Sequence, residues 1–362
     1  MSHVEKRGPK RYMAVWTDPN GRKRSKSFPR KIDAERHLTV TDASLLRRDW
    51  VDPDNGKMTF ADYAAQWVDV RDVRETTRRK YRQDVAQAAV LAGIPLGRIT
   101  PNVIEQWQSA ALKTHKRSTV ITMRATLAAV MTSAVRDRRI ASNPFHDVPR
   151  IKPEPHRIRL MSAEQIDAVR DDITPWYSAA VEVGASCGLR PGEIFGLTAG
   201  RINRKANVIH VERTLIRTKA RGQHLGPPKT AASVRTVPMP DNVSKALAAH
   251  MLRYGTGEDG LIFHSRGGKP VDAGLRANAW RRVAPAGTRW HDLRHFYASA
   301  QIAGGATVLE VQTLLGHATA QETLNTYSHL WPDHGADRAI SRIEAARKVE
   351  QVNEDQSVGP RV

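Results

Sequence analysis

The chain has 362 residues, so we expect two or three domains. Its formal net charge of +20 at pH 7 and its pI near 10.4 indicate a polyanionic partner, for which nucleic acid is a stronger candidate than an acidic membrane surface. No apolar run approaches the roughly 18 residues that span a bilayer, no lipidation signal is visible, and the start MSHVEKRGPKR lacks the apolar stretch of a secretion signal. The single cysteine, Cys187, excludes an intrachain disulfide and suits a reducing cytoplasm.

Residues 1–56 predict a small β-sheet followed by a helix. The turn DPNG separates two runs that read as strands, and the helix is expected in KIDAERHLTVTDASLLRRD. Tyr12, Trp16 and Phe28 are interleaved among the basic residues of this segment, which favours a sheet with one packed face and one basic face. Strands can read DNA in the major groove, so the candidate DNA contacts here are Arg22, Arg24 and Lys26. A solvated basic hairpin that binds nothing specific is the alternative.

Residues 57–148 predict a helical domain of four helices with clear start signals. FADYAAQWVDVR follows Thr59, ETTRRKYRQDVAQAAVLAG ends on Gly93, a third helix begins after Thr100-Pro101, and RSTVITMRATLAAVMTSAVRDRRI is long and amphipathic. Charges near two of the helix starts are expected to hold a phosphate backbone without reading sequence. The candidates are Arg78, Arg79 and Lys116, and an ordinary solvated helix face is the alternative.

A proline-rich stretch, SNPFHDVPRIKPEPHRIR, predicts an extended linker and a domain boundary. Beyond it we expect a helix capped by Ser162, a second helix in TPWYSAAVEVGASC, and a hairpin-like region through VIHVERTLIRT and SVRTVPMP. The chain then reads as mostly helical to about residue 349, and the polar end is expected to be mobile.

Three motifs supply the first candidates for chemistry. In CGLRPGEIFGL, a helix ends at Gly188, which leaves Arg190 in a turn from which it can project into a cleft. In GPPKTAASVRTVP, Lys229 lies at an exposed tip before a strand. In HDLRH, His291 and Arg294 share a helix face and can address one anion. Taken singly, each of these residues also fits an ordinary surface position.

Two further motifs follow. LLGH places His317 directly after a helix, and NTYSHL presents Tyr327, which taken alone fits a helical tyrosine packed on a core. His291 and His295 have the i, i+4 spacing of two zinc ligands, but HDLRH lacks the Glu of HExxH and there is no thiolate cluster. We therefore expect neither a metal nor a cofactor.

The order RPGE, PKT with VRTVP, HDLRH, LLGH and NTYSHL resembles the tyrosine recombinase family, in particular the phage integrase type. The resemblance covers residues 155–345 approximately, and the upstream segments look like that family's arm-binding and core-binding domains. It implies a multidomain, mainly α fold with small β-sheets. The implied parts are an N-terminal arm-type DNA-binding domain with a three-stranded sheet (1–56), a helical core-binding domain (57–148), a linker (149–158), a mixed α+β catalytic domain (159–349) and a mobile tail (350–362).

The resemblance also assigns roles around a phosphate. Arg190 and Arg294 match the family's paired arginines, which hold the scissile phosphate, and two planar guanidinium groups suit the charge that develops on its oxygens. Lys229 matches the lysine that protonates the leaving 5′ oxygen. Glu193 takes the acidic position of the arginine motif, where an orienting role is expected.

The remaining assignments concern the nucleophile. Tyr327 matches the family's attacking tyrosine, and an ordinary tyrosine with a pKa of about 10 needs a group that takes up its proton. His291 matches the histidine that handles this proton, and His317 matches the one that hydrogen-bonds a phosphate oxygen. His295 and His329 are expected to be supporting residues.

Together these features predict a site-specific DNA recombinase that works through a 3′-phosphotyrosyl intermediate, integrates a mobile genome and, with a helper, excises it. The expected partners are double-stranded DNA at core and arm attachment sites, three further protomers in a homotetramer on two duplexes, a host DNA-bending protein and an excision factor, all in the cytoplasm of a bacterial host. The segment DHGADRAISRIEAARKVE is expected either to dock on a neighbouring protomer or to pack on its own domain. Two alternatives stay open: a topoisomerase-like enzyme without partner exchange, and a non-catalytic DNA-binding regulator.

Overall fold

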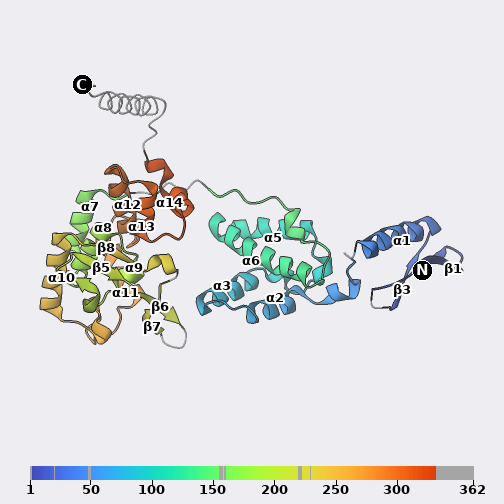
Figure 1. Ribbon diagram of the computed structural model, residues 1–362. Coiled ribbons are helices and arrows are strands. Elements are labelled where there is room, and N and C mark those ends of the chain that lie inside the picture. Colours follow the sequence, from blue (N-terminus) through green and yellow to red (C-terminus); the bar gives the residue numbers. More distant parts are fainter. Residues whose placement is uncertain are drawn as a thin grey trace, which may run out of the picture. The chain divides into compact units, whose positions relative to one another are not determined.

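The computed structural model describes residues 2–19, 21–47, 50–154, 158, 160–218, 222–228 and 230–331 (Figure 1). The chain divides into two compact units, residues 1–156 and 157–362. As the sequence predicts, the fold is multidomain and mainly helical, with small antiparallel sheets. The segment DHGADRAISRIEAARKVE and the tail at 350–362 lie outside the described residues.

The first unit begins with the predicted three-stranded sheet and helix. The order is β1-β2-β3, both pairs are antiparallel, and the elements are β1 (His3–Gly8), β2 (Arg11–Thr17), β3 (Lys23–Phe28) and α1 (Lys31–Leu46). Every second residue of β2 faces the helix, so Ala14 and Trp16 are buried against Ala34 and Leu38. This alternation gives the sheet one packed face.

The register of β3 places two of its three basic side chains, Arg24 and Lys26, on the side of the sheet that faces the helix. Lys26 pairs with Ala14 and Arg24 pairs with Trp16, and directly paired residues of antiparallel strands point to the same side. Phe28 packs against the buried cluster between the sheet and α1, and this contact fixes which residues of β3 face the helix. The open face carries two exposed basic residues, Arg11 and Lys23, together with Met13, Val15, Ser25 and Ser27.

A helical domain completes the first unit. Its helices are η1 (Pro53–Lys57), α2 (Phe60–Asp69), α3 (Glu75–Ala86), α4 (Ala89–Ala92), η2 (Leu96–Arg98), α5 (Pro101–Thr114), α6 (Arg117–Arg136) and η3 (Pro144–His146). Thr59 caps α2 by accepting a hydrogen bond from the Asp62 backbone, as expected of an N-cap. The predicted second helix is instead two, α3 and α4, because the chain turns inward at Ala88 and so buries both Ala88 and Leu91.

Helix α6 corrects one expectation about apolar runs. Within the described part of the chain it is the one helix long and apolar enough to cross a membrane by length and composition. Its buried residues, among them Met123, Leu127 and Val130, pack in the core of the helical domain. The same composition is typical of a core helix in a folded domain.

The second unit holds the remaining elements (Figure 1). Its helices are α7 (Ala163–Asp172), α8 (Pro175–Cys187), α9 (Pro191–Ile194), η4 (Ala199–Arg201), η5 (Ala231–Ser233), α10 (Asp241–Tyr254), η6 (Glu258–Gly260), α11 (Ala273–Val283), α12 (Asp292–Ala303), α13 (Val308–Leu315), α14 (Ala320–Tyr327) and η7 (Ser328–Leu330). Its strands are β4 (Ile202–Asn203), β5 (Val208–Val211), β6 (Thr214–Thr218), β7 (Gly222–Gly226) and β8 (Arg235–Pro238). The predicted hairpin-like region forms two sheets, β4-β5-β8 and β6-β7.

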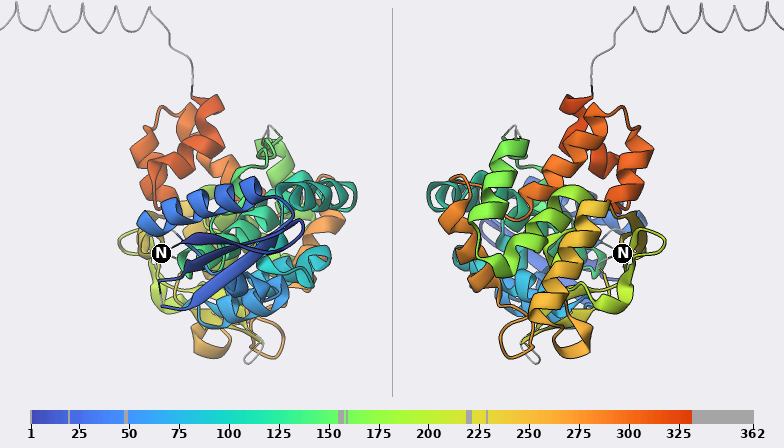
Figure 2. Two further views of the ribbon diagram at one scale, coloured as in Figure 1. Left: turned by 90° about the vertical axis from the view of Figure 1, so that its right-hand side faces the viewer. Right: turned by 90° about the vertical axis from the view of Figure 1, so that its left-hand side faces the viewer.

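Helix α8 crosses the core of this unit and packs on α7, α10 and α12. It approaches α12 closely at Gly184, where an added Cβ would lie 2.6 Å from a Leu293 methyl group. This contact brings the HDLRH segment next to the end of α8. In Figure 2, α12, α13 and α14 form one orange-to-red group within the unit.

Candidate active site

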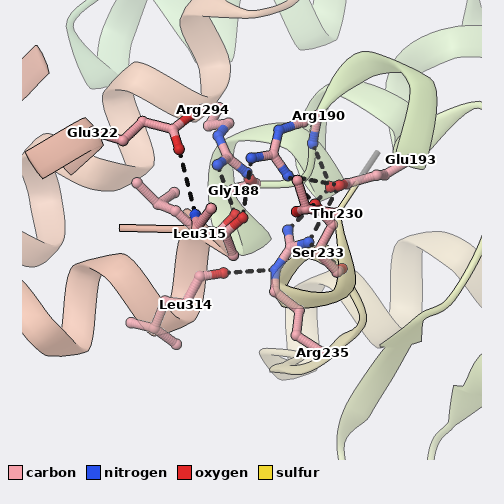
Figure 3. Close-up of polar contacts among 12 residues, drawn as sticks. Gly188, Arg190, Glu193, Thr230, Ser233, Arg235, Arg294, Leu314, Leu315 and Glu322 are labelled. Carbon is pink, nitrogen blue, oxygen red and sulfur yellow. Dashed lines mark hydrogen bonds and ion pairs between the residues drawn. The ribbon is translucent and has the colours of Figure 1, made fainter. Parts of the chain in front are cut away.

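Gly188 joins two of the predicted motifs. It ends α8 in the left-handed conformation, with φ of 63°, and its carbonyl oxygen accepts a hydrogen bond from Nη1 of Arg294 at 3.0 Å (Figure 3). An added Cβ would lie 2.3 Å from Cδ1 of Tyr297. Both the backbone conformation and the close ring therefore require glycine here, and the turn delivers Arg190 two residues later.

We expect Gly188→Ala to destabilise the catalytic unit by about 2–4 kcal/mol, since it combines a strained backbone with overpacking. Gly200→Ala is the matched control, because an added Cβ there meets nothing within 4 Å. Denaturant unfolding measures both variants. An effect of Gly188→Ala no larger than that of Gly200→Ala would contradict this account.

Three arginines converge on the C-terminal end of α13 (Figure 3). Nε of Arg235 donates to the Leu314 carbonyl at 2.8 Å, Nη2 of Arg294 donates to the Leu315 carbonyl at 2.6 Å, and Nη2 of Arg190 donates to the Gly316 carbonyl at 3.1 Å. Terminal helix carbonyls lack partners within the helix and carry partial negative charge. The helix end thus fixes all three guanidinium groups, and it brings Arg190 and Arg294 together as predicted.

Glu193 lies between two of these arginines. It accepts hydrogen bonds from Nη1 of Arg190 at 3.0 Å and from Nη2 of Arg235 at 3.0 Å, and it is buried. Burial alone would raise the pKa of its carboxyl, but Arg235, followed by Arg190, holds this pKa below its ordinary value. Glu193 is therefore an anion that accepts hydrogen bonds from both guanidinium groups. Sequence reasoning missed Arg235, although it stands in the VRTVP strand.

Arg294 is almost fully buried, with 1% of its surface exposed. Burial, with the charge of Arg190 adding, lowers its pKa to about 9, so the side chain stays charged at pH 7. The guanidinium group has five N–H donors, and its hydrogen bonds to the Gly188 and Leu315 carbonyls use only some of them. The site therefore concentrates positive charge in a region shielded from water, where an anion is bound strongly.

His317 follows the left-handed Gly316 at the end of α13. Its Nδ1 lies 2.8 Å from the Thr323 hydroxyl, and both side chains are buried. Burial, then the charge of Arg294, lowers the pKa of His317 to about 4, so the imidazole is neutral at pH 7. If the Thr323 hydroxyl donates to Nδ1, the ring proton is on Nε2, where it can serve an anion.

We expect Thr323→Val to slow DNA cleavage about 10-fold, because the ring of His317 loses the group that sets its tautomer. The substitution is close in shape and tests only the hydroxyl. Thr326→Val, on the same helix, is the control, since the Thr326 hydroxyl donates only to the Glu322 carbonyl among the described contacts. Equal single-turnover cleavage rates for the two variants would contradict the proposed role of Thr323.

Tyr327, at the end of α14, is 1% exposed. Its hydroxyl lies 2.8 Å from Nδ1 of His295, and the ring of His291 meets the ring of His295 edge-on at 4.9 Å between centroids. Burial raises the pKa of Tyr327 to about 12, against the charges of Arg294 and Arg190, which lower it. The predicted tyrosine therefore lies within electrostatic reach of the paired arginines, but it contacts His295 rather than His291.

Comparisons with known proteins decide the family. The phage integrase family profile matches residues 156–334. The putative prophage phiRv2 integrase of Mycobacterium tuberculosis is 30% identical over 356 residues, which cover 92% of each chain. The chain belongs to the phage integrase family. This integrase is a tyrosine-type site-specific DNA recombinase, as the order of its motifs predicts.

Solved structures share the integrase's fold. The Tn1549 transposon integrase in complex with a circular intermediate DNA has a TM-score of 0.68 and 22% identity, over 80% of this chain and 99% of that one. A lambda integrase tetramer bound to a Holliday junction has a TM-score of 0.56 and 17% identity, over 88% of this chain and 96% of that one. Both comparisons show that the chain shares the fold of these integrases.

Lys229 of the integrase lies outside the described residues. Its neighbours are described: the hydroxyls of Thr230 and Ser233 lie 3.0 Å apart, and Nη1 of Arg190 reaches the Ser233 hydroxyl at 3.5 Å. The segment that follows Lys229 is thus tied to the arginine cluster. Concerning the alternative of zinc, the described residues contain no group of three or more His, Cys, Asp or Glu side chains placed to hold a metal.

The predicted DNA contacts of the integrase fall into two groups. Arg24 pairs with Asp18, Asp52 and Asp54, and Arg78 donates to the carbonyl oxygens of Asp69 and Arg71. The protein thus fixes the guanidinium groups of Arg24 and Arg78, as it fixes those of Arg190 and Arg294. The other four candidates are exposed: Arg22, Lys26, Arg79 and Lys116.

The stability of the integrase is expected to fall in mild acid. The folded-state pKa of His317 and that of His291 are both about 4, below the ordinary 6.5, so the unfolded chain takes up protons first as the pH falls. Stability is therefore complete above pH 6.5 and declines between pH 6.5 and pH 4. We expect Tm to fall by more than about 4 °C in this window, and less in His317→Asn. A Tm that is flat in the wild type would contradict these shifts.

Proposed function

We propose that Tyr327 attacks a DNA phosphodiester, with Arg190 and Arg294 holding the scissile phosphate and His317 donating to one of its oxygens. Lys229 protonates the departing 5′ oxygen, and Glu193 orients the arginines. The observation that carries this proposal is the fixed pair of guanidinium groups on the end of α13, within electrostatic reach of a buried tyrosine. Charge-assisted hydrogen bonds from such a pair stabilise the charge that develops in the transition state.

The 3′-phosphotyrosyl bond conserves the energy of the broken phosphodiester. A 5′ hydroxyl from another duplex can then attack this bond and reseal the strand without ATP. We infer integration of a mobile genome as the biological outcome, and excision with a helper. Support comes from the kinship with the prophage phiRv2 integrase over nearly the whole chain.

The proposed partners are double-stranded DNA and further copies of the chain. We assign arm-site binding to residues 1–56, core-site binding to residues 57–148 and catalysis to residues 159–349, joined by the linker 149–158, in a homotetramer on two duplexes. The lambda integrase tetramer on a Holliday junction supports this assembly by its shared fold. A host DNA-bending protein, an excision factor and a location in the bacterial cytoplasm belong to the same proposal.

The test combines two supercoiled plasmids that carry candidate attachment regions, taken from DNA flanking the integrase gene and from the uninserted chromosome. Recombinant products in which the two plasmids are joined are expected. Relaxed plasmids without joined products would instead support the topoisomerase-like alternative. Specific binding without any cleavage would support the regulator and overturn the proposed function.

A further inference from the structure

Tyr327 and His295 form a hydrogen-bonded pair inside the catalytic unit. Nδ1 of His295 lies 2.8 Å from Oη of Tyr327, and the two residues come from the first turn of α12 and the end of α14. Only 1% of Tyr327 is exposed. When this hydroxyl attacks a phosphate, its proton therefore needs a protein group to receive it, and the imidazole is in place.

The surroundings of the pair are mainly apolar. Tyr327 packs in one cluster with Ala298, Ile302, Val311 and Leu315, and this burial opposes ionisation of the phenol. A hydrogen bond to an imidazole nitrogen is the contact that both fixes the oxygen and offers a proton acceptor. The His295 ring is in turn held against His291 by an edge-on contact.

Charged and titratable groups lie on several elements around the pair. The closest are His291 and Arg294 from α12 itself and Arg190 from the start of α9. The elements that pack against α12, or against α13 beside it, also carry Glu182, Cys187, Arg235, Glu310, Glu322 and His329. The positive charges favour the phenolate, whereas burial favours the neutral phenol.

We propose that His295 holds the oxygen of Tyr327 in place and accepts its proton, a role that the order of motifs gives to His291. The proposal rests on the proposed function, in which Tyr327 is the nucleophile. His291 then acts as a positioning residue that supports the His295 ring. His295 lies directly on the reacting oxygen, which makes it a catalytic residue that sequence reasoning assigned to a supporting role.

The O–H bond of Tyr327 breaks and its proton passes to Nδ1 of His295, while the oxygen forms a bond to phosphorus. The bond from phosphorus to the 5′ oxygen breaks, and that oxygen takes a proton from an ammonium group, for which Lys229 is the candidate. During rejoining, a 5′ hydroxyl gives its proton back to the amine of Lys229 and forms a bond to phosphorus; the bond from phosphorus to the tyrosyl oxygen breaks, and that oxygen regains its proton from the imidazolium of His295.

The test is single-turnover formation of the covalent adduct by the full-length protein on nicked core-site DNA. A sulfur at the bridging 5′ position removes the need to protonate the leaving group, so the rate reports on the tyrosine side alone. In His295→Asn the amide can hydrogen-bond Tyr327 but cannot take up a proton. We expect this variant to be about 100-fold slower at pH 7 and to recover as the pH is raised to 9, since hydroxide then removes the proton.

His329→Asn is the matched control, since this exposed histidine lies two residues after Tyr327, and it should behave as wild type. Two results would overturn the proposal: an undiminished rate for His295→Asn at every pH, or a pH-recoverable defect in His291→Asn alone. Failure of the wild type to form any adduct would instead count against the proposed function.

A second measurement does not depend on how His295→Asn folds. NMR of the protein labelled with ¹⁵N-histidine reports the hydrogen bonding of each ring nitrogen, and Tyr327→Phe removes the partner of His295 Nδ1. We expect the Nδ1 signal of one histidine to shift markedly in Tyr327→Phe. Unchanged histidine signals would show that the hydrogen bond is absent, and the proposal would fall.

Discussion

Tyr327→Phe is expected to abolish covalent adduct formation and recombination while leaving DNA binding intact. The change removes one oxygen atom, and phenylalanine has no group that can attack phosphorus. Because Tyr327 packs in an apolar cluster, the ring remains accommodated and the fold is retained. Denaturing gels of the protein with nicked, radiolabelled core-site DNA measure the adduct, and gel shifts measure binding.

Tyr297→Phe is the matched control for this variant. Tyr297 is buried in the same cluster, on α12, and the proposed function gives its hydroxyl no part in the chemistry. We expect wild-type adduct formation from Tyr297→Phe. An adduct that survives Tyr327→Phe would mean that another residue attacks the DNA.

Arg294→Lys is expected to slow strand cleavage about 1000-fold. A lysine presents one ammonium group, so it cannot bond the Gly188 and Leu315 carbonyls and also form a planar fork for a phosphate. Loss of one such stabilising group typically costs about 10²–10³ in rate. Single-turnover cleavage measures the effect, with thermal unfolding recorded in parallel because two buried carbonyls lose their donor.

Arg282→Lys gives the matched comparison. This arginine is exposed in the last turn of α11, and we expect its replacement to change cleavage less than twofold. If Arg294→Lys kept its fold and cleaved at a comparable rate, the arginines would not be holding the scissile phosphate.

The sequence predicts the members of the site better than the contacts among them. Arg190, Arg294, His317 and Tyr327 stand in short motifs whose order is highly specific, so their presence could be read without coordinates. That three arginines share the end of α13 depends on how β8, α9 and α12 pack, which no motif records. Arg235 is the clearest case: only the tertiary fold brings it to Glu193 and Leu314.

His295 shows a different limit. Its i, i+4 relation to His291 places both residues on one face of α12, but not which of them meets Tyr327. That choice depends on where α14 ends relative to α12. In the structure the His295 ring, rather than His291, reaches the hydroxyl.

The N-terminal sheet was predicted correctly as three strands, but two of its candidate DNA contacts, Arg24 and Lys26, lie on the side that faces the helix. The run KRSKSF has only one apolar residue, Phe28, and a basic strand suggests a basic surface. The signal for this placement was that Arg24, Lys26 and Phe28 are alternate residues, because alternate residues of a strand share a face. The register with Tyr12, Ala14 and Trp16 confirms that placement.

The most direct test of the central claim is to identify the amino acid that becomes joined to DNA. The integrase is trapped on nicked core-site DNA, the adduct is digested with protease and nuclease, and the modified peptide is sequenced by mass spectrometry. We predict a 3′-phosphate ester on the hydroxyl of Tyr327. A DNA-linked peptide that carries the bond on any other residue would contradict the account.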